Sequence, residues 1–319
     1  MDELSRLELL RALFSATALP AGVSLGIGDD AAVLAPAGAP LVWTVDSAVE
    51  GVHFRRDWLS LEDIGWRSLT AAASDLAAMG ASPRGALSAL ILPANFSDAD
   101  LLALARGQAE AAAALGTAVI GGNLARGTEL SITTTLLGEG REPVLRGGAR
   151  AGDVVALAGT VGVAAAGLAL LQRGIADGAP GDPTERALRA FRRPQARVAE
   201  GLAAAGHAHA GIDVSDGLAL DGWRLARASG VALVLDAPAL LRVAGPELTA
   251  VAALLARDPL ELALYGGDDY ALLMTFAAHE VPEPFVAVGT CGAGDGISLR
   301  SADGTIRPLE AKGFDHFAE

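Results

Sequence analysis

The chain alternates short apolar runs with polar, glycine-rich turns. Leucines at positions 4, 7, 10 and 13 recur at helical spacing and predict a helix over residues 3–17. Further along, an apolar run ending on Asp46 predicts a strand, Gly80 is expected to close a helix, and Asp98 is expected to cap another. The other elements expected in the first half share this patterning: strands over 41–45, 86–92, 117–120 and 130–137, helices over 62–79 and 98–115, and a turn over 121–127.

The segment 138–152 is rich in Gly and Arg and has little periodicity. We interpret it as the boundary between an N-terminal domain, 1–138, and a C-terminal domain, 139–319. The alternation of helices and strands on both sides of it indicates a mixed α/β fold. The elements expected in the second half are strands over 153–158 and 231–235, helices ending near 172 and 228, helices near 184–192, 195–205 and 246–264, and turns over 211–217 and 265–270.

Composition narrows the class of protein. Hydrophobic residues make up 51% of the 319 residues, so a large core is expected. The net charge of −14 argues against a general nucleic-acid binder, which needs a basic surface. No uninterrupted apolar run reaches the roughly 18–20 residues of a membrane helix, the first residues lack the basic region of a secretory signal, and Cys291 is the only cysteine. We therefore expect a cytoplasmic protein without internal disulfides that binds neither nucleic acid nor membrane.

Lysine usage excludes two common ways of binding ATP. The only lysine in the chain is Lys312, close to its end. A P-loop requires a lysine directly after its glycine-rich turn, and a protein kinase requires one on the strand that follows its glycine-rich loop. Any ATP bound by this chain must be held by other groups.

Carboxylates recur beside apolar segments. Any one Asp-Gly pair, taken alone, is most simply a turn or a helix cap. Six such places together, in a chain almost without lysine, indicate hard oxygen ligands for Mg²⁺, which bridges to nucleotide phosphates. The positions are Asp29 with Asp30, Asp46, Asp75, Asn123, Asp213 with Asp216, and Asp268 with Asp269.

Other reactive side chains give weaker signals. His53 follows the Asp46 strand and either contacts a substrate or is a partly buried loop histidine. His207 and His209 have a spacing that can bind zinc, but no further Cys or His accompanies them. Cys291 has no neighbouring base and receives no catalytic role. The remaining groups are interpreted as solvated surface residues: His279 and the arginine cluster over 189–197.

Eight stretches occur in a characteristic order: G-I-G-D-D-A-A-V (26–33), T-V-D-S-A-V-E-G-V-H-F (44–54), A-S-D-L-A-A-M-G-A (73–81), G-G-N-L-A-R-G (121–127), R-G-G-A-R-A-G-D (146–153), G-I-D-V-S-D-G-L-A-L-D (211–221), A-L-Y-G-G-D-D-Y-A-L-L (263–273) and K-G-F-D-H-F (312–317). In this order they resemble the thiamine-monophosphate kinase family, within the aminoimidazole-ribonucleotide synthetase-like superfamily. The first, second and last stretches are those that distinguish this kinase within the superfamily. The resemblance runs from about residue 5 to the C-terminus.

The resemblance implies a two-domain α/β fold in which the N-terminal sheet joins that of a second copy, giving a homodimer built around a barrel. It implies ATP-dependent phosphorylation of thiamine monophosphate to thiamine diphosphate, by direct in-line transfer with several Mg²⁺ ions and with ATP as co-substrate. The acceptor phosphate is largely ionised at neutral pH, so no general base is required. Catalysis would then consist of positioning and charge neutralisation.

The resemblance also implies roles for residues at the matching positions. The Mg²⁺ ligands would be Asp29, Asp30, Thr44, Asp46, Asp75, Asn123, Asp213 and Asp216. ATP would contact Gly121, Gly122, Asn123, Arg146 and Ser215. The thiamine-phosphate pocket would be lined by His53, Asp268 and Phe314. The residues implied to be catalytic are Asp46, Asp75, Arg146 and Asp216.

Two positions depart from the family pattern. Asn123 stands where the family has an aspartate, so this position keeps an oxygen ligand but loses a charge and is expected to weaken one Mg²⁺ site. Asp268 is one methylene shorter than the expected glutamate. Two alternatives stay open: a non-catalytic protein that binds nucleotide or thiamine phosphate, made inert by Asn123, and another ATP-dependent member of the superfamily.

Overall fold

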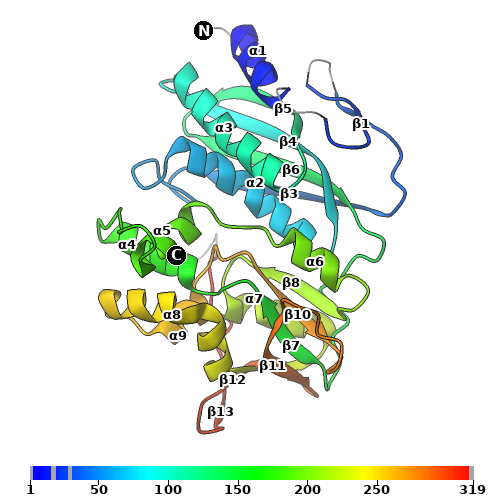
Figure 1. Cartoon of the computed structure of the whole chain (residues 1–319), viewed down its shortest axis with the longest axis vertical. Helices are drawn as coiled ribbons and strands as arrows, with labels where there is room; N and C mark the ends of the chain where they lie inside the picture. The colour runs from blue at the N-terminus through cyan, green and yellow to red at the C-terminus, as the bar shows by residue number, and fades with distance from the viewer. Residues whose placement is uncertain (1–2, 16–18, 28–30, 316–319) are drawn as a thin grey trace. The chain divides into compact units, whose positions relative to one another are not determined.

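The computed structural model describes residues 3–15, 19–27 and 31–315. Asp29 and Asp30 lie outside the described residues. The chain divides into two compact units: unit 1 comprises Met1–Leu76 with Ala81–Arg141, and unit 2 comprises Ala77–Gly80 with Glu142–Glu319. Each unit contains its own sheet and helices (Figure 1).

Unit 1 is built on a four-stranded sheet in the order β3-β6-β4-β5. The β4–β5 pair is parallel and the other two pairs are antiparallel. Helices α2 and α3 pack beside this sheet (Figure 1). The elements are α1 (Glu3–Phe14), β1 (Val23–Leu25), β2 (Val33–Leu34), β3 (Leu41–Val49), α2 (Leu61–Ala78), β4 (Ser82–Pro93), α3 (Asp98–Ala114), β5 (Val119–Gly127) and β6 (Ser131–Glu139).

Close packing in unit 1 depends on small residues. A Cβ on Gly107 of α3 would lie 1.9 Å from the carbonyl oxygen of Glu62 on α2, so only glycine lets these helices approach so closely. Leu69, Leu104 and Leu136 are fully buried between the helices and the sheet. Because aliphatic burial is the main favourable contribution to folding, this Ala- and Leu-rich core is consistent with the low aromatic content.

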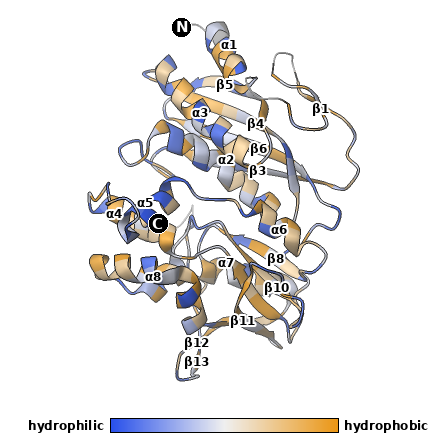
Figure 2. Cartoon of the chain, in the orientation of Figure 1, coloured by the Kyte–Doolittle hydropathy of each residue, from blue (hydrophilic) through white to orange (hydrophobic). Residues whose placement is uncertain are grey.

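Unit 2 is built on a seven-stranded sheet in the order β13-β12-β9-β11-β7-β10-β8. The β9–β12 pair is parallel and the others are antiparallel. Figure 2 shows apolar residues along its strands and on helix α8. The elements are β7 (Val154–Ala158), α4 (Val163–Gln172), α5 (Pro183–Arg192), α6 (Val198–Ala204), β8 (Ala210–Val214), α7 (Leu218–Ser229), β9 (Ala232–Asp236), α8 (Ala237–Leu255), α9 (Pro259–Tyr265), β10 (Ala271–Phe276), β11 (Val286–Gly292), β12 (Ile297–Arg300) and β13 (Ile306–Pro308).

Most of the expected helices and strands are confirmed, but several boundaries were wrong. The strand expected to end on Asp46 continues to Val49, because β3 pairs with β6 along its whole length. The turn expected over 121–127 is part of β5, which pairs with β4 as far as Gly127. Ser97, and not Asp98, caps α3: its side chain accepts the N–H of Asp100 in a capping box.

Helix α8 is longer than expected. The expected helix start at 246 coincides with a kink, where Gly245 has φ 80° and precedes Pro246. A further helical segment comes before the kink, capped by Asp236. By length and composition alone α8 is apolar enough to cross a membrane. It contains Arg242 and Glu247, however, and its buried residues pack inside unit 2 as in a core helix.

Candidate functional site

In unit 1, two of the predicted metal ligands are in direct contact. The hydroxyl of Thr44 on β3 donates a hydrogen bond to the carboxylate of Asp75 on α2. Asp46 lies two residues beyond Thr44 on the same strand, and therefore on the same face of the sheet. The helix-covered face of β3 thus brings together oxygen ligands from a strand and a helix.

The strand register separates Asn123 from this group. Asp46 pairs with Thr134 of β6, whereas Asn123 pairs with Ala89 of β4. Ala89 pairs in turn with Thr133, one residue away from Thr134. Neighbouring rows of a regular sheet face opposite sides, so the structure does not bring Asn123 together with Asp46.

Gly121 and Gly122 form a stretch of β5 without side chains. A Cβ on Gly122 would lie 1.9 Å from the carbonyl oxygen of Ser88, so no other residue fits this position without a shift of the backbone. His53 lies in the turn after β3, where its Nδ1 accepts the N–H of Val49 at 3.1 Å. This contact fixes one ring nitrogen within the loop.

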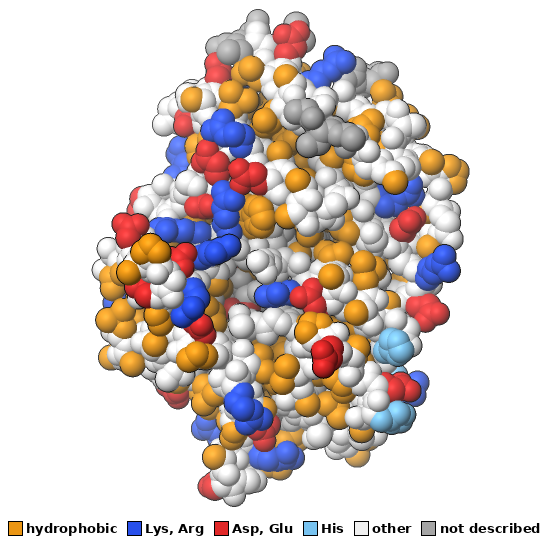
Figure 3. All heavy atoms as spheres, viewed as in Figure 1, with side chains coloured by type: hydrophobic (Ala, Val, Ile, Leu, Met, Phe, Trp, Pro, Cys, Tyr) orange, Lys and Arg blue, Asp and Glu red, His pale blue; other side chains and the backbone are white. Residues whose placement is uncertain are grey.

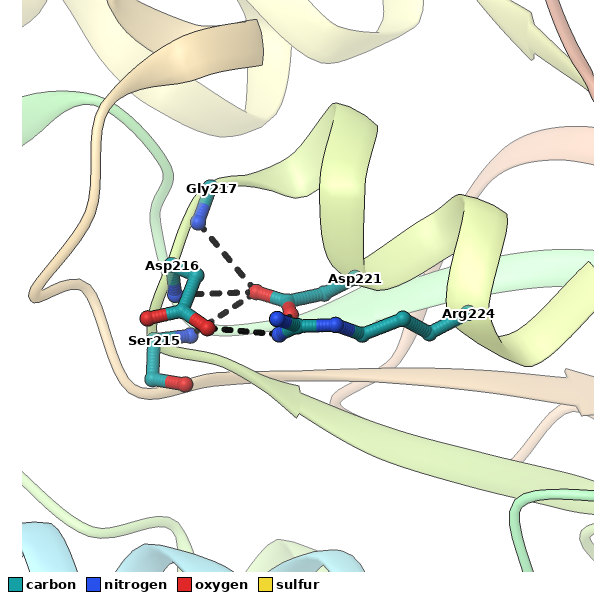
Figure 4. A network of polar contacts seen from close by, with 5 residues as sticks. All are labelled: Ser215, Asp216, Gly217, Asp221 and Arg224. Carbon is teal, nitrogen blue, oxygen red and sulfur yellow. Dashed lines mark hydrogen bonds and ion pairs between the residues drawn. The ribbon is translucent and has the colours of Figure 1, made fainter. Parts of the chain in front are cut away.

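In unit 2, the side chain of Asp221 points from α7 toward the backbone of the loop after β8 (Figure 4). One oxygen of Asp221 accepts the backbone N–H groups of Ser215, Asp216 and Gly217, at 3.1, 3.0 and 3.2 Å. Arg224 donates to Asp216 at 2.5 Å and to Asp221 at 2.7 Å. Gly217, with φ 124°, begins α7 without a side-chain cap, so Asp221 supplies the acceptor that a capping residue usually provides.

Opposing effects act on the pKa of Asp221 in this network. Asp221 is 1% exposed, and burial raises its pKa to about 6, with a further increase from the nearby charge of Asp216. Arg224 and the backbone donor of Asp216 act in the opposite direction. Asp213, on the preceding strand β8, is also buried.

Two further segments converge on the same loop. The N–H of Asp268 donates to the carbonyl of Ser215 at 2.8 Å, and the N–H of Phe314 donates to the carbonyl of Asp216 at 2.9 Å. Tyr270 donates its hydroxyl to Asp268 at 3.3 Å. Four predicted functional positions from distant parts of the sequence therefore meet within unit 2: Ser215, Asp216, Asp268 and Phe314.

The other sequence-derived candidates are more scattered. The side chain of Arg146 is exposed in unit 2, and its carbonyl accepts the hydroxyl of Ser229. His209 pairs with Asp153 at 2.9 Å. Cys291 is buried, and burial raises its pKa to about 12, so it is an inert thiol at neutral pH.

Within the described ranges, no three His, Cys, Asp or Glu side chains lie close enough together to hold a metal ion. The donors that are present are hard oxygens, which is the chemistry that Mg²⁺ requires. Mg²⁺ needs few protein ligands when substrate phosphates and waters complete its shell. The donor sets of unit 1 (Thr44, Asp46, Asp75) and unit 2 (Asp213, Asp216) therefore fit this ion chemically.

Asp221 and Arg224 are the structural residues that sequence reasoning missed. Asp221 closes the quoted stretch G-I-D-V-S-D-G-L-A-L-D, and Arg224 follows one helical turn later. A signal was present, since an aspartate in the first turn of a helix whose N-cap is glycine is a good candidate to accept free backbone N–H groups.

Known proteins match this chain over most of its length. The family model for AIR synthase related protein, N-terminal domain, matches residues 28–139, and that for the C-terminal domain matches 150–294. Thiamine-monophosphate kinase of Mycobacterium tuberculosis is 37% identical over 292 residues, covering 91% of this chain and 85% of that protein. The protein of the same name from Aquifex aeolicus is 34% identical over 295 residues, covering 91% and 92%.

Solved structures give the same result. The structure described as AaThiL complexed with AMPPCP and TMP has a TM-score of 0.82 and 31% identity, covering 99% of this chain and 97% of that one. Thiamine-monophosphate kinase from Stenotrophomonas maltophilia has a TM-score of 0.82 and 35% identity, covering 95% and 97%. Escherichia coli HypE, at 20% identity and a TM-score of 0.75, shares the fold.

Proposed function

Because this chain belongs to the thiamine-monophosphate kinase family, we propose that it transfers the γ-phosphoryl group of ATP to thiamine monophosphate, giving ADP and thiamine diphosphate. The observation that carries this proposal is the likeness to AaThiL, whose complex holds AMPPCP, an ATP analogue, together with TMP. That likeness extends over 99% of this chain at 31% identity. The two ligands correspond to the donor and the acceptor of this reaction.

The loop around Asp216 is the part of unit 2 best arranged to act on phosphates. Its backbone is fixed by Asp221, its carboxylate is oriented by Arg224, and Asp268 and Phe314 attach to it through main-chain hydrogen bonds. Such preorganisation lowers the cost of orienting reactants. We propose that Ser215 contacts ATP. The residues that would contact thiamine monophosphate are Asp268, Phe314 and His53.

The oxygen ligands named above would hold several Mg²⁺ ions, which would neutralise phosphate charge and bridge to the nucleotide. The proposed ligands are Asp29, Asp30, Thr44, Asp46, Asp75, Asn123, Asp213 and Asp216. The exposed guanidinium of Arg146 adds positive charge for the transferring group. The main chain of Gly121 and Gly122 on β5, with Asn123 beside it, would contact ATP.

The acceptor oxygen requires no base from the protein. The second pKa of a phosphate monoester is about 6, so the attacking oxygen is already largely ionised at neutral pH. Transfer then proceeds directly between the two bound substrates, without a phosphorylated enzyme. The protein supplies position and charge.

We further propose that the active form is a cytoplasmic homodimer in which a second copy covers the open face of the unit 1 sheet, forming a barrel. Alternate residues of β3 on that face are strongly exposed: Leu41 at 56%, Trp43 at 72% and Val45 at 63%. Leu87 and Ile91 of β4 are exposed apolar residues with the same alternation. A contiguous apolar surface of this kind is typical of an interface.

A coupled assay tests the proposal. ADP release is measured with ATP and Mg²⁺, with and without thiamine monophosphate, and the product is identified as thiamine diphosphate by chromatography. Product that depends on both substrates is the expected result. Binding of thiamine monophosphate without ADP release would instead establish the non-catalytic alternative, and absence of both would exclude this acceptor.

A further inference from the structure

Unit 2 contains a pocket that none of the proposed catalytic steps uses. It has a volume of about 200 Å³ and lies between the N-terminal end of α4 and the chain that runs from α5 to α6. Four arginines line it, together with Thr160 and Asp269: Arg186, Arg189, Arg193 and Arg197. Figure 3 shows basic side chains gathered in the region of α5.

The arginines reach one pocket because of how α5 is built and how it ends. Arg186 and Arg189 lie three residues apart, on one side of the helix, while Leu188 and Phe191 are buried on the other. The helix ends at Arg192, and the following segment carries Arg193 and Arg197 to the same pocket. In a chain with a net charge of −14, four positive charges around one cavity are a strong local concentration.

The guanidinium of Arg197 has a donor without an acceptor within the described ranges of the chain. Nε of Arg197 is buried and has no hydrogen-bond partner among the residues described, and Nη1 of Arg197 is 3.5 Å from Glu200. No ion pair to the side chain of Arg189 is found in the described part of the chain. Arg186 pairs with Glu247 at 3.2 Å. Buried donors without acceptors are costly, and an anion with several oxygens would satisfy them.

Gly159 makes room for this arrangement. A Cβ at Gly159 would lie 3.1 Å from Nε of Arg197, closer than ordinary contact, and its φ of 101° also favours glycine. The turn before α4 therefore leaves space for the guanidinium of Arg197. A side chain at position 159 would crowd this guanidinium, so the glycine preserves its place beside the pocket.

Asp269 contributes little negative charge to the pocket. Its two oxygens accept the N–H groups of Gly162 and Ala164 at the start of α4, at 2.6 and 3.2 Å. Burial raises its pKa to about 8, so the carboxyl is mostly neutral at pH 7. Asp269 thus already occupies two of the N–H groups at the start of α4, and recognition of an anion depends mainly on the arginines.

We propose that this pocket binds a phosphate or diphosphate group of a small phosphorylated molecule, independently of Mg²⁺. Arginine forks match phosphate oxygens in geometry and charge. The volume is below the roughly 300–1,000 Å³ of pockets that enclose drug-sized ligands, so the phosphate enters and the remainder of the ligand stays outside. The pocket adjoins the active-site loop through consecutive residues, because Asp268 attaches to Ser215 while Asp269 lines the pocket.

Titration calorimetry with pyrophosphate in the presence of EDTA tests this site, because without divalent ions the carboxylates cannot bind phosphate through a metal. The wild-type chain is expected to bind one pyrophosphate saturably. Arg189→Gln and Arg197→Gln are each expected to weaken binding by roughly tenfold or more, the usual effect of losing a charged hydrogen bond. Arg242→Gln removes an exposed arginine of α8 outside the pocket and serves as the matched control.

Further variants and ligands test how the pocket recognises phosphate and which class of phosphorylated molecule it binds. Arg197→Lys keeps the charge without the fork, and an intermediate affinity in this variant supports bidentate recognition even if Arg197→Gln folds poorly. Parallel titrations with inorganic phosphate, ADP and thiamine monophosphate identify which phosphorylated class binds tightest. Absence of saturable binding in wild type, or equal losses in Arg189→Gln and Arg242→Gln, would overturn the proposal. Kinase activity in Mg²⁺ is read separately, so failure here does not decide the catalytic function.

Discussion

Asp221 accepts the backbone N–H of Asp216 at 3.0 Å, so one aspartate fixes the main chain of the loop that presents the other. The same oxygen of Asp221 accepts two neighbouring N–H groups, and Arg224 links the two carboxylates. Asp221 is therefore a positioning residue: it is 1% exposed and acts through the loop. Its substitution should affect stability and catalysis together.

We expect Asp221→Asn to lower the free energy of unfolding by roughly 1–3 kcal/mol, because the amide turns its NH₂ group toward donors that previously met oxygen. We also expect kcat to fall by about tenfold or more as Asp216 loses its orientation. Urea unfolding and steady-state kinetics measure the two effects. Asp303→Asn is the matched control, because Asp303 also accepts a backbone N–H, that of Thr305, but is exposed. Equal behaviour of the two variants would contradict the positioning role.

The contact between Thr44 and Asp75 gives a second prediction. Asp75→Asn or Asp46→Asn should reduce turnover almost to zero while the fold survives, because each change removes a charge from the proposed metal ligands. Thr44→Val keeps the side-chain volume but removes the hydrogen bond to Asp75, so it should raise the Mg²⁺ concentration required for half-maximal rate. ADP release across a Mg²⁺ titration measures both. Asp63→Asn, in the first turn of the same helix α2, should remain active. Full activity of Asp75→Asn would exclude the metal role.

A substitution at Asn123 is expected to lower the Mg²⁺ requirement, whereas the changes at Thr44 and Asp75 weaken the proposed metal site. Asn123→Asp restores a charged oxygen ligand at an exposed position of β5 and should lower the Mg²⁺ concentration for half-maximal rate several-fold. Asn95→Asp introduces the same charge in an exposed loop of the same unit and should leave the Mg²⁺ dependence unchanged. A gain shared by both variants would indicate a general effect of charge, and no gain in either would place Asn123 outside the metal site.

The sequence predicted the chain segments better than their contacts. Apolar periodicity located most helices and strands, because burial of one face imposes the period. It misplaced 121–127 because Gly and Asn are typical of turns, whereas here Gly122 is required by the carbonyl of Ser88 on the neighbouring strand. That requirement depends on pairing between segments more than 30 residues apart, which local patterns do not contain.

The candidate site shows the same limit. Motif order identified Ser215, Asp216, Asp268 and Phe314, and the structure brings them together in unit 2. The role of Asp221 depends on the first turn of α7 bringing its carboxylate to the backbone of the loop. The position of Asp221 in the sequence does not specify this contact. The sequence predicted that the arginines of 189–197 form a solvated helical face. In the structure three of them line a pocket, because the helix ends at Arg192 and the chain changes direction there.

The pKa of Asp269 leads to a pH-dependent stability. Desolvation raises the pKa of this half-buried carboxyl to about 8 in the fold, whereas a free aspartate has a pKa near 3.9. Between these values the folded chain retains a proton that the unfolded chain has released, so the contribution to stability is complete below about pH 3.9 and is lost as the pH rises toward 8.

Asp269→Asn does not titrate, so it provides the reference. The unfolding free energy of wild type minus that of the variant should fall between pH 5 and pH 8, by at most about 1.4 kcal/mol per pH unit, and level off above that. Urea unfolding at a series of pH values measures this difference. Asp258→Asn, at the exposed cap of α9, should give a difference that is constant with pH. A constant difference for Asp269→Asn as well would show that its carboxyl is ionised throughout.

The final prediction concerns the oligomeric state and the open face of the unit 1 sheet. Trp43 is 72% exposed, and its side chain lies on the face opposite Thr44, so it can be changed without touching the contact between Thr44 and Asp75. If a second copy covers this face, Trp43→Asp buries an unpaired charge in the interface, and the chain should become monomeric. Light scattering coupled to size-exclusion chromatography measures the mass. Leu254→Asp places the same charge at a similarly exposed apolar position of α8 in unit 2 and should remain dimeric. A monomeric wild type, or a dimer that tolerates Trp43→Asp, would remove this face from the assembly and leave the exposed tryptophan to be explained by another partner.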